Sequence, residues 1–213
     1  FARNGTWQGG ATQAEIEAGN TANAAATWTH GEAFFPALSF NPALSGAVTS
    51  TTKFFAPFTH TVPTGYSSLR VGQAWNRADA GPEIVFGLNF TDASEVSNPG
   101  NENTVRGIFP LDAGSPVGKK FYWETTIGGT DLNGQQIGVL DADHSLVNSL
   151  GIGRDTDTTT TFGVGYVGSS GQIQHNVTTT SFVGSYGSTF GPGDIIGTAA
   201  DLGRWAVWFS KNG

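Results

Sequence analysis

Cysteine and methionine are both absent from the 213-residue chain. Without cysteine no disulfide can stabilise the fold, so the burial of apolar side chains must do so. The same absence excludes thiolate catalysis and cysteine-ligated metal sites. A chain that has no methionine and starts with Phe1 does not show its own translation start. We therefore expect a segment or a processed product of a longer protein.

Basic residues are also scarce. Ten Lys and Arg stand against seventeen Asp and Glu, which gives a formal net charge of −7. No basic run is present, and an acidic surface repels the phosphate backbone that nucleic-acid-binding proteins neutralise. The chain also has no stretch of 18 apolar residues that could cross a membrane as a helix. We therefore predict neither nucleic-acid binding nor membrane insertion.

Glycine, by contrast, is abundant, with 31 residues, and nine prolines accompany it. Both weaken helices, whereas the Thr, Val, Phe and Trp residues between them favour strands. One short helix is expected after Thr12, because Thr12 and Glu15 form a capping-box pattern and Gly19 or Asn20 can end the helix. The sequence therefore predicts an all-β fold, an antiparallel sandwich or barrel, with at most one short helix.

Ten segments combine strand-forming residues with turn residues at both ends. They are residues 34–40, 47–54, 83–90, 104–109, 120–127, 136–141, 162–167, 171–176, 194–200 and 204–209. The stretch 67–118 holds Asn-Pro-Gly-Asn and Ser-Pro turns and is predicted to be a connector with two or three strands.

The two ends of the chain carry the same short pattern. Residues 1–5 read Phe-Ala-Arg-Asn-Gly and residues 209–213 read Phe-Ser-Lys-Asn-Gly. Asn-Gly after a strand is a strong signal for a tight hairpin. Two interpretations follow: one period of a tandem array with a repeat of 208 residues, counted from position 1 to position 209, or a circularly permuted single domain. The duplication favours the array.

The second half of the chain resembles the SPRY family of β-sandwich domains. The matching blocks are Gly-Lys-Lys-Phe-Tyr-Trp-Glu (118–124), Ile-Gly-Val (137–139), Phe-Gly-Val-Gly-Tyr (162–166), Gly-Asp-Ile-Ile-Gly (193–197), Ala-Asp-Leu (200–202) and Trp-Phe-Ser-Lys-Asn-Gly (208–213). Blocks similar to the end of that domain come first: Asn-Gly-Thr-Trp (4–7), Phe-Pro-Ala-Leu-Ser (35–39), Gly-Ala-Val-Thr (46–49), Phe-Phe-Ala-Pro-Phe (54–58) and Pro-Thr-Gly-Tyr (63–66).

This order implies three segments. Residues 1–66 resemble the C-terminal half of a SPRY-like sandwich, residues 67–118 a connector with the first strands of the next domain, and residues 119–213 its N-terminal half. Each half alone would expose strand edges and half a core. We therefore expect that neighbouring copies complete each domain or that the two halves close on each other.

The resemblance also implies a binding module, in which loops at one end of a rigid sandwich recognise a ligand. The recognition loops would be residues 7–30, 128–135 and 142–161. Candidate binding residues in them are Trp7, Trp28, Asp131, Asn133, Gln135, His144, Asn148 and Arg154. Trp7 and Trp28 are expected at the surface, and Trp123 and Trp208 in the core.

No pattern for catalysis, a metal or a cofactor rises above background. The Gly-Val-Gly-Tyr-Val-Gly run at 163–168 lacks the helix that a dinucleotide needs. Asp141, Asp143, His144 and Ser145 are sequence neighbours, which seldom converge as a triad does, and the Asp-x-Asp pairs do not continue into a calcium loop. We predict no catalytic residue, no metal ligand and no cofactor.

We therefore expect a non-catalytic structural and interaction module on a cell or virion surface or otherwise extracellular. It would be one period of a tandem-repeat fibre, adhesin or phage appendage. Its expected partners are neighbouring copies of itself and a protein or a surface glycan. The alternative is a carbohydrate-binding module of a secreted polymer-degrading enzyme, for which solvent-exposed Trp7 and Trp28 would stack on sugars.

Overall fold

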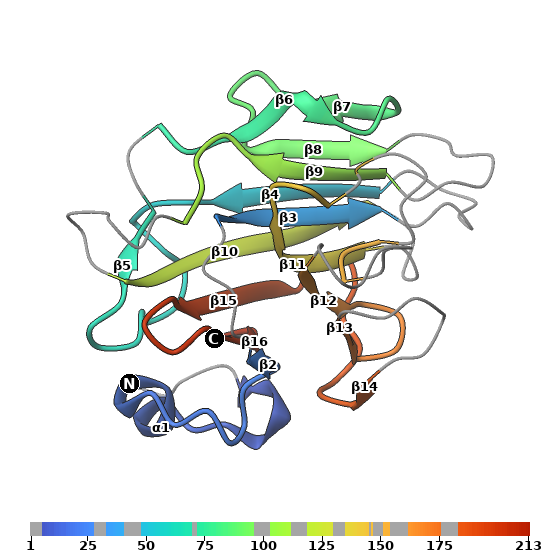
Figure 1. Cartoon of the computed structure of the whole chain (residues 1–213). Coiled ribbons are helices and arrows are strands. Elements are labelled where there is room, and N and C mark those ends of the chain that lie inside the picture. Colours follow the sequence, from blue (N-terminus) through green and yellow to red (C-terminus); the bar gives the residue numbers. More distant parts are fainter. Residues whose placement is uncertain are drawn as a thin grey trace.

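Two β-sheets packed face to face make up most of the molecule (Figure 1). The computed structural model describes residues 6–27, 33–40, 48–69, 72–95, 103–111, 119–129, 135–144, 146, 151–153, 162–175 and 183–213. The helical elements described are the 3-10 turn η1 (Gln8–Gly10) and the helix α1 (Gln13–Ala18). The strands are β1 (Thr6–Trp7), β2 (Ala26–Thr27), β3 (Phe34–Phe40), β4 (Val48–Lys53), β5 (Ser67–Ser68), β6 (Trp75–Ala80), β7 (Ile84–Phe86), β8 (Asp92–Glu95), β9 (Asn103–Gly107), β10 (Lys120–Gly129), β11 (Gln135–Asp141), β12 (Gly163–Val167), β13 (Gln172–His175), β14 (Val183–Ser185), β15 (Ile195–Asp201) and β16 (Ala206–Lys211).

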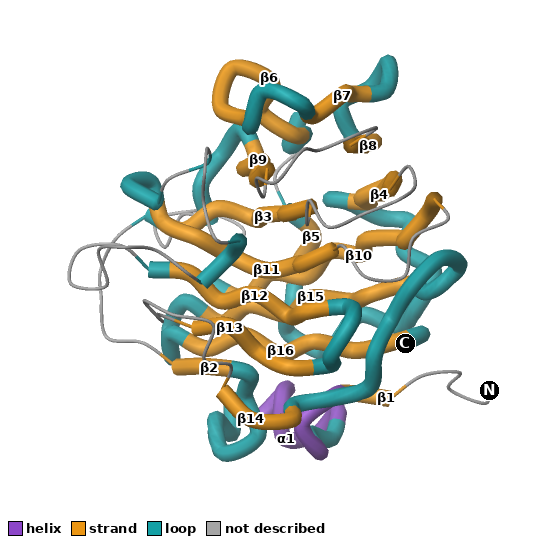
Figure 2. The backbone as a smooth tube through the Cα atoms, turned by 90° about the vertical axis from the view of Figure 1, so that its right-hand side faces the viewer, coloured by secondary structure: helices purple, strands orange, loops and turns teal. Residues whose placement is uncertain are grey.

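Sheet A contains nine strands in the order β1-β16-β15-β10-β4-β8-β7, with β2 beside β16 and β5 beside β10. Sheet B contains seven strands in the order β14-β13-β12-β11-β3-β9-β6. Pairing is antiparallel throughout the described ladders, apart from the two-residue parallel contact of β5 with β10. In both views, β6 and β7 lie at one end of the molecule and α1 at the other (Figures 1 and 2). The predicted all-β antiparallel sandwich is confirmed.

The two halves of the chain close on each other. β10 pairs with β4 from Glu124↔Lys53 to Gly129↔Val48, and β11 pairs with β3 from Gln135↔Phe40 to Asp141↔Phe34. Segments 1–66, 67–118 and 119–213 each contribute strands to both sheets. Of the two expected arrangements, this chain therefore has the one in which its own halves complete a single sandwich.

The segment 67–118 contains more strands than predicted, since β5 to β9 all lie in it. β6 reads Trp-Asn-Arg-Ala-Asp-Ala and β8 reads Asp-Ala-Ser-Glu, so neither shows clear apolar alternation. They form because β9 and β4 offer them hydrogen-bonding partners. The predicted strand 83–90 shortens to Ile84–Phe86, because the chain turns at Gly87.

Apolar side chains of both sheets meet in the main core. Trp123 and Trp208 are both fully buried, as predicted, but they lie on different faces of sheet A. Trp123 belongs to the core between the sheets, whereas Trp208 belongs to a second cluster on the outer face, with Trp7, Ile16 and Tyr122. A third cluster covers part of the outer face of sheet B and includes Leu140 and Ile152.

Helix α1 begins and ends where the sequence predicts. The Thr12 hydroxyl accepts a hydrogen bond from the Glu15 backbone N–H, and the Glu15 carboxylate accepts one from the Thr12 N–H, which completes the capping box. These hydrogen bonds lower the pKa of Glu15. Gly19 ends the helix with φ +71°, a conformation in which a side chain would be strained.

A buried carboxylate attaches the segment that follows β4 to sheet A. Glu124 on β10 is 1% exposed and accepts hydrogen bonds from the backbone N–H groups of Thr59 and His60, both at 2.7 Å. The His60 Nδ1 and the Tyr122 hydroxyl lie 3.1 and 3.2 Å from the same carboxylate. Burial raises the pKa of Tyr122, so its hydroxyl stays a donor. Glu124 is therefore a structural group.

Replacing Glu124 with Gln should lower the free energy of unfolding by roughly 2 kcal/mol, because the amide NH₂ would face a backbone N–H donor. Urea denaturation of the chain and the variant measures this difference. Asp143→Asn makes the same acid-to-amide change at an exposed position and should leave stability nearly unchanged. Equal effects of the two changes would contradict the structural role of Glu124.

Candidate functional site

Five of the candidate binding residues lie outside the described residues: Trp28, Asp131, Asn133, Asn148 and Arg154. The other three, Trp7, Gln135 and His144, are all buried, with exposed fractions of 8%, 5% and 3%. They lie in separate parts of the sandwich, and their side chains contribute to its packing.

The expectation that Trp7 lies at the surface is wrong. The turn η1 and the helix α1 fold over the outer face of sheet A, and the indole of Trp7 packs there with Ile16 and Trp208. Its Nε1–H donates a hydrogen bond of 3.1 Å to the side-chain oxygen of Gln13. A buried ring cannot offer its face to a sugar, so Trp7 is not a stacking platform.

Gln135 links the two sheets. Its side-chain oxygen accepts a hydrogen bond from the Ser50 hydroxyl, and its NH₂ donates to the carbonyl of Thr49, both at 2.9 Å. Gln135 belongs to β11 of sheet B, whereas Ser50 and Thr49 belong to β4 of sheet A. This amide therefore holds the layers together across the end of the sandwich.

His144 lies in a short loop that Asp141 shapes. One carboxylate oxygen of Asp141 accepts the His144 backbone N–H at 2.9 Å, and the other accepts the backbone N–H of Phe162. Arg106 donates to the carbonyls of Asp141 and Ala142. Asp141 and His144, which are close in the sequence, therefore belong to a buried loop that the Asp141 carboxylate holds through backbone N–H groups. In the described ranges, no group of three or more His, Cys, Asp or Glu side chains could hold a metal ion.

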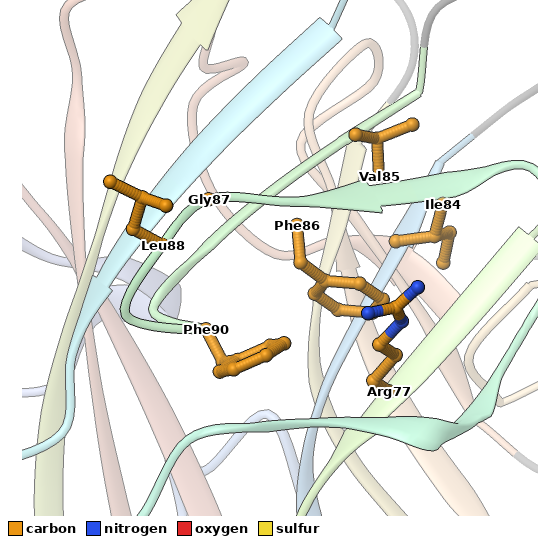
Figure 3. Close-up of a pocket in the computed structure, with 7 residues that line it drawn as sticks. All are labelled: Arg77, Ile84, Val85, Phe86, Gly87, Leu88 and Phe90. Atoms are coloured by element: carbon orange, nitrogen blue, oxygen red, sulfur yellow. The ribbon is translucent and has the colours of Figure 1, made fainter.

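A different region presents apolar side chains to solvent. The exposed large hydrophobic residues described are Phe55, Val85, Leu88, Phe90 and Ile108. Val85, Leu88 and Phe90 belong to β7 and the turn that joins it to β8, and Leu88 is 99% exposed. Together with Arg77, Ile84, Phe86 and Gly87 they line a pocket of about 360 Å³ (Figure 3). We name these seven residues the apolar corner.

The backbone of the apolar corner is held by a buried tryptophan. Trp75, which is 1% exposed, donates its backbone N–H to the carbonyl of Phe90 at 2.7 Å and its indole N–H to the carbonyl of Thr91 at 3.1 Å. The Trp75 ring in turn packs edge-on against Phe54 in the core. Phe90 has φ +51°, an unusual conformation for an aromatic residue. The core thus fixes the turn in a strained shape, a feature that clusters at binding sites.

Arg77 supplies the charge of this pocket. Figure 3 shows its side chain rising from β6 toward the side of the pocket that carries Phe86 and Ile84. Arg106 forms a two-point contact with Asp79, and Arg204 pairs with Asp201 at 2.9 Å. Within the part of the chain that the structure describes, Arg77 has neither an ion pair nor a hydrogen bond from its side chain. Its guanidinium is therefore available to an outside carboxylate.

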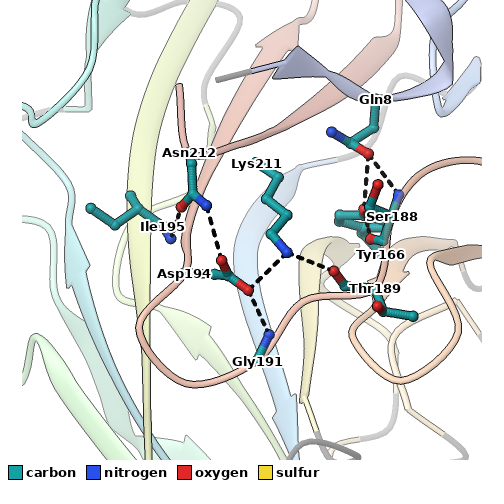
Figure 4. Close-up of polar contacts among 9 residues, drawn as sticks. All are labelled: Gln8, Tyr166, Ser188, Thr189, Gly191, Asp194, Ile195, Lys211 and Asn212. Atoms are coloured by element: carbon teal, nitrogen blue, oxygen red, sulfur yellow. Dashed lines mark hydrogen bonds and ion pairs between the residues drawn. The ribbon is translucent and has the colours of Figure 1, made fainter. Parts of the chain in front are cut away.

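A second pocket, of about 340 Å³, lies beside the Asn-Gly end of β16. Asp194 accepts hydrogen bonds from Gly191 N–H and Asn212 Nδ2, both at 2.9 Å, and pairs with Lys211 at 3.0 Å (Figure 4). Lys211 also donates to the carbonyl of Thr189. Burial alone would raise the pKa of Asp194, but these donors hold it below its usual value. The polar groups here are used in fixing the chain, so this pocket is a structural feature.

The sequence signal for the apolar corner was weak. Residues 83–90 read as a strand, and the exposure of Leu88 and Phe90 follows only from the turn at Gly87.

One copy of the duplicated pattern at the two ends of the chain can be followed in the structure, since residues 1–5 lie outside the described residues. At residues 209–213, Asn212 takes φ +57° and its side-chain oxygen accepts a hydrogen bond from the Ile195 N–H at 2.9 Å.

No family model, curated protein or solved structure matches the chain. No helix in the described ranges is long and apolar enough to span a membrane.

The Asp194 network predicts a pH-dependent contribution to stability. Asp194→Asn should lower the free energy of unfolding by about 1 kcal/mol at neutral pH, because it removes the ion pair with Lys211. Since the folded-state pKa is depressed, this contribution is complete above the unfolded pKa of about 3.9 and is lost as the pH falls through the lower folded value. Urea denaturation at a series of pH values should show the difference shrinking as the pH falls below the unfolded pKa. A difference that stays constant with pH would contradict this role.

Proposed function

We propose that the chain is a non-catalytic binding module whose apolar corner docks on a partner protein. One observation carries this proposal: Val85, Leu88 and Phe90 are exposed on β7 and the turn after it, and Arg77, which lines the same pocket, has no partner in the described structure. Soluble monomers seldom leave contiguous apolar patches on their surfaces, and such patches mark interaction sites. Aromatic residues and arginine dominate the energetics of protein interfaces.

Three carboxylates that have structural roles support a non-catalytic function. Asp141 and Glu124 are buried and accept backbone N–H groups through both oxygens. Asp194 accepts three donors in a network that fixes the end of β16. These three acids are thus engaged in holding the chain together.

A protein partner fits the apolar corner better than a glycan does. Sugar sites combine aromatic faces with several hydrogen-bonding side chains. Here Leu88 and Val85 are aliphatic, and Arg77 is the one side chain among the seven that can donate a hydrogen bond. The burial of Trp7 also removes one of the two rings on which the carbohydrate-binding alternative rested.

We also propose that the module is SPRY-like and is one period of a tandem array in an extracellular fibre, adhesin or virion appendage, with neighbouring copies among its partners. The SPRY-like blocks at 118–124, 137–139, 162–166, 193–197 and 208–213 fall on or beside β10, β11, β12, β15 and β16, which supports the first part. The Asn-Gly pattern at both ends and the acidic, cysteine-free composition support the second. Repetition would raise the apparent affinity of a weakly binding corner for a dense surface.

Leu88→Ser should weaken binding of corner-directed ligands by about tenfold or more, because it removes the most exposed apolar anchor. The probe is a random peptide library displayed on phage and selected on the intact chain, followed by affinity measurement of the selected peptides. Phe55→Ser makes an equivalent change at an exposed residue outside the corner and should alter affinity by less than about twofold. Both variants should keep their stability within about 0.5 kcal/mol.

Peptides that bind the chain and the Leu88→Ser variant equally well would place the binding surface elsewhere. Failure to select any peptide on the intact chain would also count against the proposal, because a preformed apolar pocket should retain some of them.

A further inference from the structure

Among the described strands, β7 is the last of sheet A and has no strand on its other side. The sheet order ends β4-β8-β7, and β7 pairs with β8 through Val85↔Ser94 and its neighbours. Gly87 N–H donates to the carbonyl of Asp92 at 3.1 Å, so Gly87 faces β8 in a hydrogen-bonded pair. Hydrogen-bonded pairs alternate with non-hydrogen-bonded pairs along an antiparallel ladder, so the backbone N–H and C=O of Val85 also point toward β8. The backbone N–H and C=O of Phe86 therefore point away from the sheet.

Apart from its length of three residues, this edge lacks several of the features by which proteins usually protect an exposed strand. Proline, lysine, inward-pointing charges and bulges prevent edge strands from pairing with other chains. β7 reads Ile-Val-Phe and has none of these, and Val85 is 54% exposed. The edge of sheet B at the same end of the molecule contrasts with it, since β6 carries Arg77 and Asp79 and its register with β9 is irregular.

Charge identifies the kind of strand that would fit. Arg77 lines the same pocket as Ile84 and Phe86, and its side chain is exposed and has no partner in the described structure. An incoming carboxylate would form a charge-assisted hydrogen bond with it, which is stronger than a neutral one. Apolar side chains at alternate positions of the same segment would meet the exposed face of Val85 and the Leu88–Phe90 turn. The occupant therefore needs both an acidic residue and an alternating apolar pattern.

We propose that the apolar corner binds an extended segment of a partner protein that adds to β7 as a further strand of sheet A and places an Asp or Glu side chain on Arg77. This inference rests on the proposed binding function and specifies its mode. Main-chain hydrogen bonds to Phe86 would hold the segment, and Arg77 in the apolar corner would select segments that carry an acidic side chain.

The test uses peptides that are selected on the intact chain and depend on Leu88. They should be enriched in alternating apolar residues with an Asp or Glu, and Arg77→Gln should weaken them by about tenfold or more. Lys119→Gln removes an equal charge at an exposed residue outside the corner and should change affinity by less than about twofold. Two variants of each peptide, both methylated at every second backbone nitrogen but offset by one residue, test the backbone contact. One variant should lose binding and the other should bind nearly as well as the unmodified peptide, because only every second N–H faces β7.

Amide hydrogen exchange gives a readout of the backbone contact itself. The Phe86 N–H should exchange rapidly in the free chain and become about tenfold or more protected with the peptide bound, whereas side-chain contact alone would not protect it. Peptides that depend on Leu88 but neither on Arg77 nor on their backbone N–H groups would overturn strand addition and leave the proposed function standing. Absence of any Leu88-dependent peptide would overturn both.

A second copy of this chain is the other occupant that the edge could take. Sedimentation of the chain without peptide separates the two cases. A dimer that dissociates in the Leu88→Ser variant and excludes the peptides would assign the edge to self-association and overturn the partner segment. A monomer across the concentration range that binds the peptides supports it.

Discussion

The pairing of β10 with β4 and of β11 with β3 is the constraint on which the rest of the structure depends. These ladders lie in the middle of sheets A and B, and each joins a strand of residues 34–53 to one of residues 120–141. Without them sheet A would divide between β10 and β4, and sheet B between β11 and β3. Each part would then expose unpaired backbone and half of the apolar core, which is costly in water. The consecutive strands β10 and β11 lie in different sheets, so the same pairing also brings the two layers together.

Closure of the sandwich determines which loops remain accessible. The region around η1 and α1 covers the outer face of sheet A with Trp7 and Ile16, and the loop after β11 covers part of sheet B with Leu146 and Ile152. Side chains that read as ligand-binding residues, such as Trp7 and His144, are buried by these coverings. The apolar corner lies at the end of the molecule away from α1, on the outermost strand of sheet A (Figures 1 and 2).

The core and the apolar corner are coupled through Trp75. Its ring packs against Phe54 inside the sandwich, while its two N–H groups hold the carbonyls of Phe90 and Thr91. A turn held in this way does not need to be ordered by its ligand, so less of the interaction energy is lost on binding. The left-handed backbone of Phe90 is tolerated because the buried tryptophan determines the path of the chain around it.

Local patterns were enough to predict much of the fold. The turn residues and strand-forming runs predicted β3, β4, β10 and β11 to within about two residues, and the capping box of Thr12 and Glu15 predicted α1. These signals survive in the sequence because they act over a few residues. β6 and β8 were missed because they are polar and become strands only when β9 and β4 offer them backbone partners.

The site itself was decided by the tertiary structure. Sequence alone determined an acidic, cysteine-free, all-β chain with one capped helix, since composition and local spacing are sufficient for that. Whether a tryptophan or a leucine is exposed depends on which segments fold over it. Trp7 is buried because η1 and α1 return to sheet A, and Leu88 is exposed because the chain turns at Gly87, at the outermost strand of that sheet. Both outcomes follow from contacts between residues far apart in the chain, which no local pattern records.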